Sequence, residues 1–426
     1  MDMNANLNDG FFGFELELED FEVRKIGSSL NRLYSVGPGG SILSLPEIKD
    51  GVVFFCSMDQ HVYALDCAGG GVKWKFRTGG NMAGNSTALN AEDDVVYAGN
   101  LAGSFYALGA KTGKEIWRFR AGSGVTTKPL FYRDRIFFPC LNGNVYCLDK
   151  DGRELWRFKT GGEIYYAPAG DDGKIYFGSY DGNFYCIDAG SGREIWRFRT
   201  GDEIQSEGPI HVHKGVAYFA SMDNNLYAVD AKTGRELWRF KTGKYGNCCS
   251  PIIHDDVVYH GSRDGILYAV SLDGRELWRF KAGGLIGPGV SAQKNRVYFG
   301  CEDANLYCLD VNGNELWRFR TSGPIWNYPV VWKNSLLFGS WDCHFYCIDF
   351  SGKEKWRFAT SNKTMCKVDP PYKVFEMVVK KSFEDANEKD GKYEINLGAS
   401  SEDRFYTAKS EYVGETTYAT KKDYGQ

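Results

Sequence analysis

Short runs of apolar residues, separated by turn residues, recur along most of the chain. One run, Val297-Tyr298-Phe299-Gly300, is followed by a second that contains Tyr307 and a third that contains Trp317. Short runs rich in aromatic and β-branched residues, bounded by Gly, Asn and Asp, are typical of β-strands. The dipeptides between them, such as Asp181-Gly182 and Asn312-Gly313, readily adopt the positive φ of tight hairpins. The pattern predicts an all-β protein.

The same pattern repeats eight times. Each unit ends in a Trp-basic-Phe string, successive tryptophans are 39 to 43 residues apart, and a Tyr precedes each Trp by 10 or 11 positions. Four short strands in about 40 residues form a β-propeller blade, whose faces are buried only when copies pack around an axis. We therefore expect an eight-bladed β-propeller of four-stranded antiparallel blades over residues 41–361. The repeated tryptophans are Trp74, Trp117, Trp156, Trp196, Trp238, Trp278, Trp317 and Trp356.

Identical placement in every unit predicts a structural role for these tryptophans, since a large indole can fill the space between neighbouring blades. Basic residues follow each Trp, as Arg157 and Lys159 do on either side of Phe158 after Trp156. On an outermost strand such charges discourage pairing with other chains. A basic surface around the rim that binds an anionic partner is the alternative interpretation.

The string YAVDAKTGRELWRF at residues 227–240 resembles the tryptophan-docking repeat of the quinoprotein (PQQ-type) propellers, and similar strings stand in all eight units. That family contains quinone-dependent alcohol and sugar dehydrogenases. It also contains non-catalytic members such as the outer-membrane assembly lipoprotein. The connections between units are uniformly short here and lack the large insertions of the enzymes, so the chain is closest in character to the non-catalytic members.

Composition and charge narrow the range of partners. The chain has 51 basic and 55 acidic residues, a net charge of −4, which gives no general electrostatic basis for binding nucleic acid. A mean hydropathy of −0.40 and the lack of an apolar stretch near about 18 residues argue against a transmembrane segment.

The 12 cysteines form no CxxC pair, and the first residues do not resemble a secretory signal. We expect a cytoplasmic, monomeric protein.

The residues that precede the first strand of each unit differ between units, whereas the rest of the repeat hardly varies. Variation on a constant frame marks the place where a function would reside. The most distinctive of these residues are the vicinal pair Cys248-Cys249 and, in the equivalent loop two units on, Trp326. Calcium-dependent quinoprotein alcohol dehydrogenases carry a vicinal disulfide against their cofactor. The resemblance therefore implies that Cys248, Cys249 and Trp326 are candidates for binding PQQ.

Calcium would accompany that cofactor, and it prefers carboxylate and amide oxygens. The candidate ligands are Glu203, Glu207, Asn247 and Asn327. In the alternative interpretation, the two cysteines are ordinary residues of a channel-lining loop and no metal is bound.

Three functions follow, and no catalytic residue is assigned in any of them. The main hypothesis is a non-catalytic scaffold without a cofactor, which binds a protein or peptide through loops at the channel or through blade edges. The alternatives are a PQQ- and calcium-dependent alcohol or sugar dehydrogenase and a small-ligand sensor that uses the central channel.

Both ends of the chain lie outside the repeats. Residues 1–40 form an N-terminal extension in which Phe14–Glu19 alternates apolar and acidic residues, a pattern that predicts an edge strand. Residues 362–426 form a C-terminal extension that is polar and charged beyond about residue 384. Such a composition cannot bury a core, and we expect disorder there.

Overall fold

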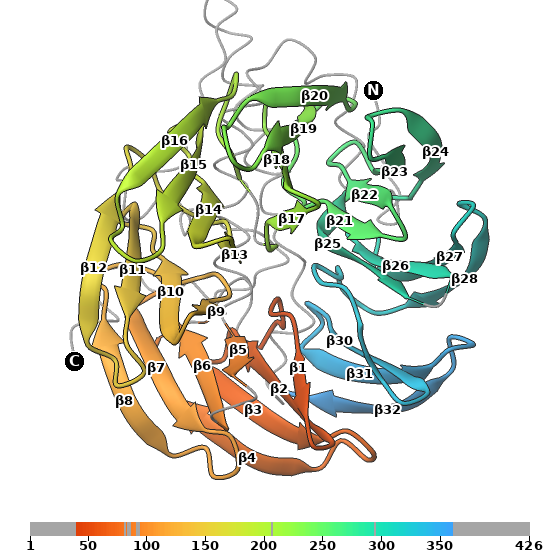
Figure 1. Cartoon of the computed structure of the whole chain (residues 1–426). Helices are drawn as coiled ribbons and strands as arrows, with labels where there is room; N and C mark the ends of the chain where they lie inside the picture. Colours follow the sequence, from red (N-terminus) through yellow and green to blue (C-terminus); the bar gives the residue numbers. More distant parts are fainter. Residues whose placement is uncertain are drawn as a thin grey trace, which may run out of the picture.

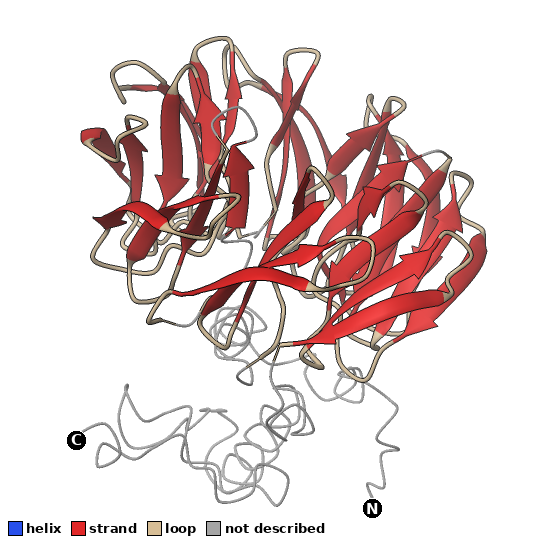
Figure 2. Ribbon diagram, turned by 90° about the horizontal axis from the view of Figure 1, so that it is seen from below, coloured by secondary structure: helices blue, strands red, loops and turns tan. Residues whose placement is uncertain are grey.

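All the regular structure that is described is β-strand. The structure is a computed structural model, which describes residues 40–80, 82, 87–90, 94–205, 208–293 and 295–360. Within these residues, 32 strands form eight four-stranded antiparallel sheets (Figure 2). The sheets surround a central axis as the blades of a propeller (Figure 1), which confirms the fold expected from the repeats. The strand predicted over 14–19 and the disorder predicted beyond about 384 lie outside the described residues.

Each blade contains four consecutive strands, ordered from the channel to the rim (Figure 1). The innermost strands are β1 (Glu47–Lys49), β5 (Thr87–Asn90), β9 (Leu130–Tyr132), β13 (Ala169–Asp171), β17 (His211–His213), β21 (Ile252–His254), β25 (Ile286–Gln293) and β29 (Val330–Trp332). The second strands are β2 (Val52–Ser57), β6 (Val95–Gly99), β10 (Arg135–Pro139), β14 (Lys174–Gly178), β18 (Val216–Ser221), β22 (Val257–Gly261), β26 (Arg296–Cys301) and β30 (Ser335–Gly339).

The third strands are β3 (His61–Asp66), β7 (Ser104–Gly109), β11 (Asn144–Leu148), β15 (Asn183–Asp188), β19 (Asn225–Asp230), β23 (Ile266–Ser271), β27 (Asn305–Asp310) and β31 (His344–Asp349). The outermost strands are β4 (Val72–Arg77), β8 (Glu115–Arg120), β12 (Glu154–Lys159), β16 (Glu194–Arg199), β20 (Glu236–Lys241), β24 (Glu276–Lys281), β28 (Glu315–Arg320) and β32 (Glu354–Ala359). The part of the chain that is described includes no helix long and apolar enough to cross a bilayer.

The strand order determines which loops share an end of the propeller. Neighbouring strands are antiparallel, so the turn between the second and third strands lies at the same end as the connection that crosses to the next blade. We call this end the crossover face. Each connection there runs from an outermost strand back to an innermost strand, so it carries its residues towards the channel.

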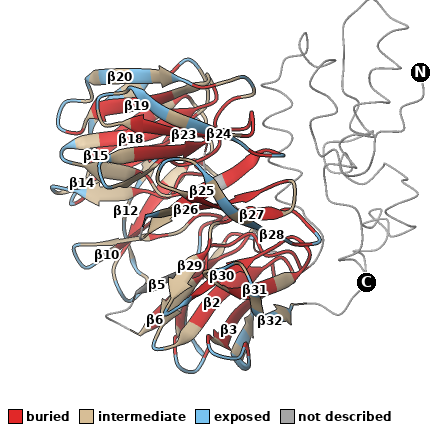
Figure 3. Ribbon diagram, turned by 90° about the vertical axis from the view of Figure 1, so that its right-hand side faces the viewer, coloured by how far each residue is buried: buried red, intermediate tan, exposed pale blue. Residues whose placement is uncertain are grey.

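The core lies in the middle strands of the blades. Second and third strands such as β14 and β15 are buried nearly throughout, whereas outermost strands such as β16 alternate between exposed and half-buried residues (Figure 3). A bulge occurs in each outermost strand immediately before the repeated Trp, as the shift between Ala228 and Val229 of β19 opposite Leu237 shows. The bulged residue points outwards: Leu237 is 42% exposed.

Each repeated tryptophan contacts the following blade. Its indole lies against the glycine of that blade's turn between third and fourth strands; a Cβ added to Gly113, for example, would lie 2.6 Å from the Trp74 ring. The eight glycines have φ between +66° and +88°, so both the turn and the contact require the absence of a side chain. They are Gly70, Gly113, Gly152, Gly192, Gly234, Gly274, Gly313 and Gly352.

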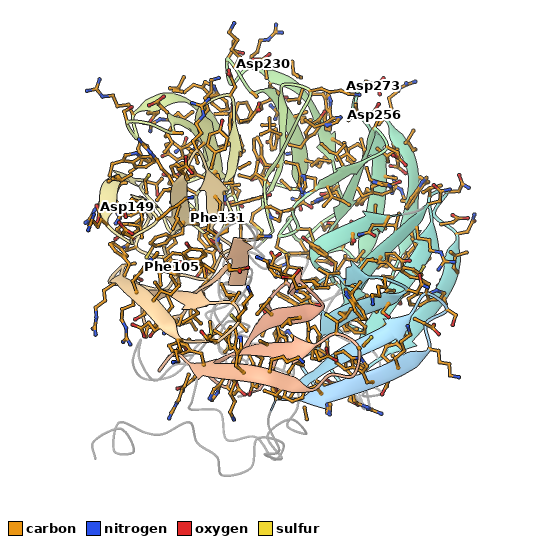
Figure 4. The ribbon with its side chains drawn as sticks, turned by 60° about the horizontal axis from the view of Figure 1, so that its bottom comes forward. Phe105, Phe131, Asp149, Asp230, Asp256 and Asp273 are labelled. Carbon is orange, nitrogen blue, oxygen red and sulfur yellow. The ribbon has the colours of Figure 1, made fainter. Side chains whose placement is uncertain are left out.

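Hydrogen bonds orient most of these indoles. Six of the eight indole N–H groups donate to a backbone carbonyl of the contacted turn, as Trp74 does to Ala110 at 2.7 Å. In the other two turns a different donor binds the equivalent carbonyl: Arg135 donates to Ala189, and Tyr176 donates to Ala231. The carboxylates that cap these turns lie at the outer rim, where Asp149, Asp230 and Asp273 are labelled in Figure 4.

The ring is closed by packing between the last blade and the first. Among the described strands, no sheet combines strands of the first and last blades; each sheet contains four consecutive strands. Instead, Trp356 lies against Gly70 and donates to the Cys67 carbonyl at 3.2 Å. Phe55 stacks on Phe345 with ring centroids 4.2 Å apart. The closing interface therefore repeats the contacts that join the blades elsewhere.

The basic residues at the rim are largely engaged within their own blades. In seven blades the Arg after the repeated Trp pairs with the Glu three positions before it, as Arg157 does with Glu154. The same guanidinium lies over the ring of the repeated Tyr, at 5.1 Å for Arg157 and Tyr146. Because these arginines already have a carboxylate partner, the arrangement does not favour a rim that binds anions.

Truncating one repeated tryptophan should destabilise the whole ring. Trp238→Ala removes an inter-blade indole and its hydrogen bond to Leu272, and we expect a loss of about 3–5 kcal/mol of unfolding free energy, measured by chemical denaturation. The control is Leu237→Ala, the exposed neighbour on the same strand, which should cost less than about 1 kcal/mol. Equal effects of the two substitutions would contradict an inter-blade role for the indole.

Candidate functional site on the crossover face

Backbone hydrogen bonds hold the loops of the crossover face together. In blade 8, Ile325 N–H donates to the Cys301 carbonyl of the preceding blade at 3.1 Å, and Trp341 N–H donates to the Pro324 carbonyl at 3.0 Å. Equivalent bonds occur in several other blades, for example from Tyr180 N–H to the Glu163 carbonyl at 2.9 Å. Where both bonds occur, the connection is fixed to the turns of two neighbouring blades, so the backbone presents its side chains in a repeated geometry.

A second set of variable residues shares this face with the connections. It consists of the residue before the Asp, Asn or Ala in each turn between second and third strands. This position changes in both size and charge from blade to blade. The eight residues are Met58, Leu101, Leu141, Tyr180, Met222, Arg263, Glu302 and Trp341. The sequence analysis did not single out this set; aligning the units by the repeated Tyr, which follows each of these residues by five positions, would have found it.

The turn itself is fixed by a hydrogen bond from the repeated Tyr. In six blades the hydroxyl donates to the turn Asp, as Tyr227 does to Asp223 at 2.6 Å. Burial and the hydrogen bond to Asp223 raise the pKa of Tyr227, so its hydroxyl stays protonated and keeps donating. The neighbouring variable residue is thereby held in place without having to bond to anything itself.

Aromatic residues from the two variable sets meet in two places. The rings of Trp326 and Trp341, both 3% exposed, have centroids 5.5 Å apart in blade 8. In blade 4, Tyr165 and Tyr180 stack at 4.8 Å, and the Gln205 side-chain amide donates to the Tyr180 hydroxyl. Because Trp326, Trp341 and Tyr165 are almost fully covered, these pairs make the loops of the crossover face rigid.

The structure separates the vicinal cysteines from Trp326. All eleven cysteines in the described residues are free and buried, so the disulfide implied by the resemblance is not formed. The Cys249 thiol donates to the Ile286 and Gly287 carbonyls of blade 7, at 3.0 and 2.5 Å. Trp326 lies on the other side of Gly287, where a Cβ would be 3.1 Å from the Trp326 Cα. Burial also raises the pKa of Cys249, so it is not a reactive thiolate.

The calcium candidates come from different blades. Glu203, Asn247 and Asn327 belong to blades 5, 6 and 8, and Glu207 lies outside the described residues. The Asn247 amide is occupied: its oxygen accepts from Thr242 and His260, each at 3.0 Å, and its nitrogen donates to Ser221. Among the residues described, no three His, Cys, Asp or Glu side chains are grouped so that they could hold a metal. These residues do not fit a calcium-quinone centre.

Asn247 instead belongs to a buried polar pair that replaces an apolar contact. His260 stands where β18 and β26 have Phe219 and Phe299, and Asn247 stands where blade 8 has Ile325. His260 Nε2 lies 3.0 Å from Asn247 Oδ1, an arrangement in which the imidazole donates. Burial lowers the pKa of His260 to about 3, so it is neutral at ordinary pH.

Comparisons with known proteins agree on the fold and the family. The family model described as "Outer membrane protein assembly factor BamB" matches residues 32–104, 59–139, 141–279 and 263–376. No curated protein gives a significant match to the chain.

Solved structures share the fold at low sequence identity. BamB from Moraxella catarrhalis is 21% identical, with a TM-score of 0.64 over 72% of this chain and 96% of that one. The computationally designed Ika8 protein is 17% identical, with a TM-score of 0.65 over 75% and 99%. The quinohemoprotein alcohol dehydrogenase ADHIIG from Pseudomonas putida HK5 is 16% identical, with a TM-score of 0.60 over 72% and 71%. At these identities the similarity shows a shared fold and says nothing of the chemistry in the channel.

The buried histidine should make the fold sensitive to acid. In the unfolded chain His260 binds a proton near its ordinary pKa of about 6.5, whereas the folded chain excludes that proton down to about 3. Stability from this residue is therefore complete at neutral pH and is lost as the pH falls through that interval. The double variant His260→Phe/Asn247→Ile restores the apolar pair of other blades. Between about pH 7 and pH 4 it should lose roughly 2–3 kcal/mol less unfolding free energy than the wild type, measured by urea denaturation. Identical pH profiles of the two proteins would show that His260 does not cause the loss of stability between about pH 7 and pH 4.

Proposed function

Because the chain belongs to the family of the outer membrane protein assembly factor BamB, we propose that it is a non-catalytic scaffold that binds a protein or peptide partner. The crossover face is the proposed binding surface, with the blade edges as a secondary possibility. The observation that carries the proposal is the contrast between a nearly uniform frame and two variable sets of residues gathered on one face.

The chemistry of that face supports binding more than catalysis. Its residues provide aromatic pairs, apolar side chains of different size and a few polar groups, as Trp326, Tyr180 and Glu302 illustrate. Aromatic side chains in a rigid setting are typical of protein-binding surfaces. Cys249 bonds to backbone carbonyls, and the Asn247 amide oxygen accepts from Thr242 and His260, which supports a structural role for both residues over the binding of a quinone or calcium.

We also propose that the protein acts in the cytoplasm as a monomer. Eleven free, buried cysteines in the described residues are compatible with a reducing compartment. The outermost strands carry ion-paired arginines and glutamates, which disfavour edge-to-edge association between copies.

Substitutions borrowed from other blades can test the binding surface without disturbing the frame. Tyr180→Met and Glu302→Leu introduce residues that stand at the equivalent positions of blades 1 and 2. We expect the double variant to retain the wild-type melting temperature and to lose at least about tenfold in affinity for a partner captured by the wild-type chain, because interface affinity concentrates in a few central residues.

The matched control changes the rim in the same manner. Leu277→Lys introduces the residue that blade 8 carries as Lys355, and its affinity for the partner should equal that of the wild type. Loss of binding in this control alone would move the interface to the blade edges. Micromolar binding of PQQ in the presence of Ca²⁺, measured by calorimetry with the wild-type chain, would contradict the scaffold proposal.

A further inference from the structure

Arg263 is a buried cation without a partner. It lies in the turn between β22 and β23 on the crossover face, and its side chain is 5% exposed. Nη1 is fully buried and forms no hydrogen bond, and within the described residues no carboxylate lies at ion-pair distance from the guanidinium. The hydroxyl of the adjacent Ser262 is likewise buried with no partner.

Two carboxylates hold positions related to that of Arg263, and in the described part of the chain neither forms an ion pair with it. Asp264, the next residue, accepts hydrogen bonds from the Tyr268 hydroxyl at 2.8 Å and the Ile266 N–H at 2.9 Å. Glu302 occupies the same turn position in blade 7, but it does not form an ion pair with Arg263. Within the described residues, Arg263 therefore has no ion-pair partner.

Folding alone does not explain an arginine at this position. Buried arginines are nearly always paired, and a desolvated, uncompensated guanidinium costs free energy. The frame has no need of it, because the equivalent turns of blades 1 and 5 carry Met58 and Met222 with the same backbone. A destabilising residue in a replaceable position is typical of a binding site.

We propose that Arg263 binds a carboxylate of the partner, either an acidic side chain or a chain terminus. The guanidinium offers two parallel N–H donors that match a carboxylate. This inference rests on the proposed scaffold function and assigns the chemistry of its anchor.

The test compares melting temperatures of the full chain with simple probes at constant ionic strength. N-acetyl-glutamate amide represents a side-chain carboxylate, N-acetylglycine represents a chain terminus, and N-acetyl-glutamine amide is the neutral control. At tens of millimolar, the better carboxylate probe should raise the melting temperature of the wild type by roughly 1–3 °C, and the neutral control should not. The probe that acts identifies the source of the carboxylate. A larger effect of inorganic phosphate would overturn the assignment to a carboxylate.

Two variants separate a binding role from a structural role. Arg263→Met should melt at or above the wild-type temperature without probe and should lose the response to the carboxylate. Arg263→Lys should keep part of the response. The proposal is overturned if Arg263→Met still responds, or if the wild type does not respond and Arg263→Met melts at a lower temperature. These readouts need no captured partner, so a carboxylate response together with failed capture would contradict the scaffold function while leaving the anion site intact.

Discussion

The contact between each repeated indole and the glycine turn of the next blade is the constraint on which the structure depends. A four-stranded blade buries its faces only against its neighbours, so each blade must present a flat, apolar interface of the same shape on both sides. The indole fills the gap near the rim, where the wedge between blades is widest, and the glycine leaves room for it. Because this contact is repeated in all eight blades, the turn, the bulge before Trp and the Arg–Glu–Tyr group recur with it.

Most positions of the repeat are needed for packing between blades, so the residues that can vary for function lie in the loops. The crossover face collects both variable sets of residues, and the two charged residues of the turn set, Arg263 and Glu302, lie in the neighbouring blades 6 and 7. There the His260–Asn247 pair, Arg263 and Glu302 replace residues that are apolar in most other blades. Each replacement costs stability in a position where the frame accepts an apolar residue. Because these residues lie in neighbouring blades, one side of the ring differs chemically from the rest.

Much of the fold follows from the sequence because its determinants are local. The number of repeats predicts the number of blades. Within each repeat, such as residues 227–240, the spacing of Tyr, Gly and Trp predicts the strand order and the positions of the tight turns. The closure of the ring could not be deduced, because a repeat does not reveal whether its last copy exchanges a strand with the first. The structure shows contiguous blades and a closing Trp356 contact.

The candidate site was only partly accessible from the sequence. The variable connections were identified, but side-chain direction within them alternates, and this alternation decides which residues face the neighbouring blade. Cys249 bonds to blade 7, and Gly287 stands between it and Trp326, so a pairing inferred from resemblance does not form. Trp341 and Arg263 lie at a turn position whose variation becomes visible only when the eight units are aligned with one another. The buried Nη1 without a hydrogen bond, which further distinguishes Arg263, is visible only in three dimensions.

The central claim is that eight equivalent interfaces close the ring and leave the crossover face free to bind. The most direct test is the unfolding free energy of Trp356→Ala, which removes the indole at the junction between the last and first blades. If the ring is closed as described, this substitution destabilises the chain by about as much as the same change at an internal junction, roughly 3–5 kcal/mol, in a single cooperative transition. A negligible loss of stability, or early separate unfolding of the first or last blade in the wild type, would contradict closure by an equivalent interface.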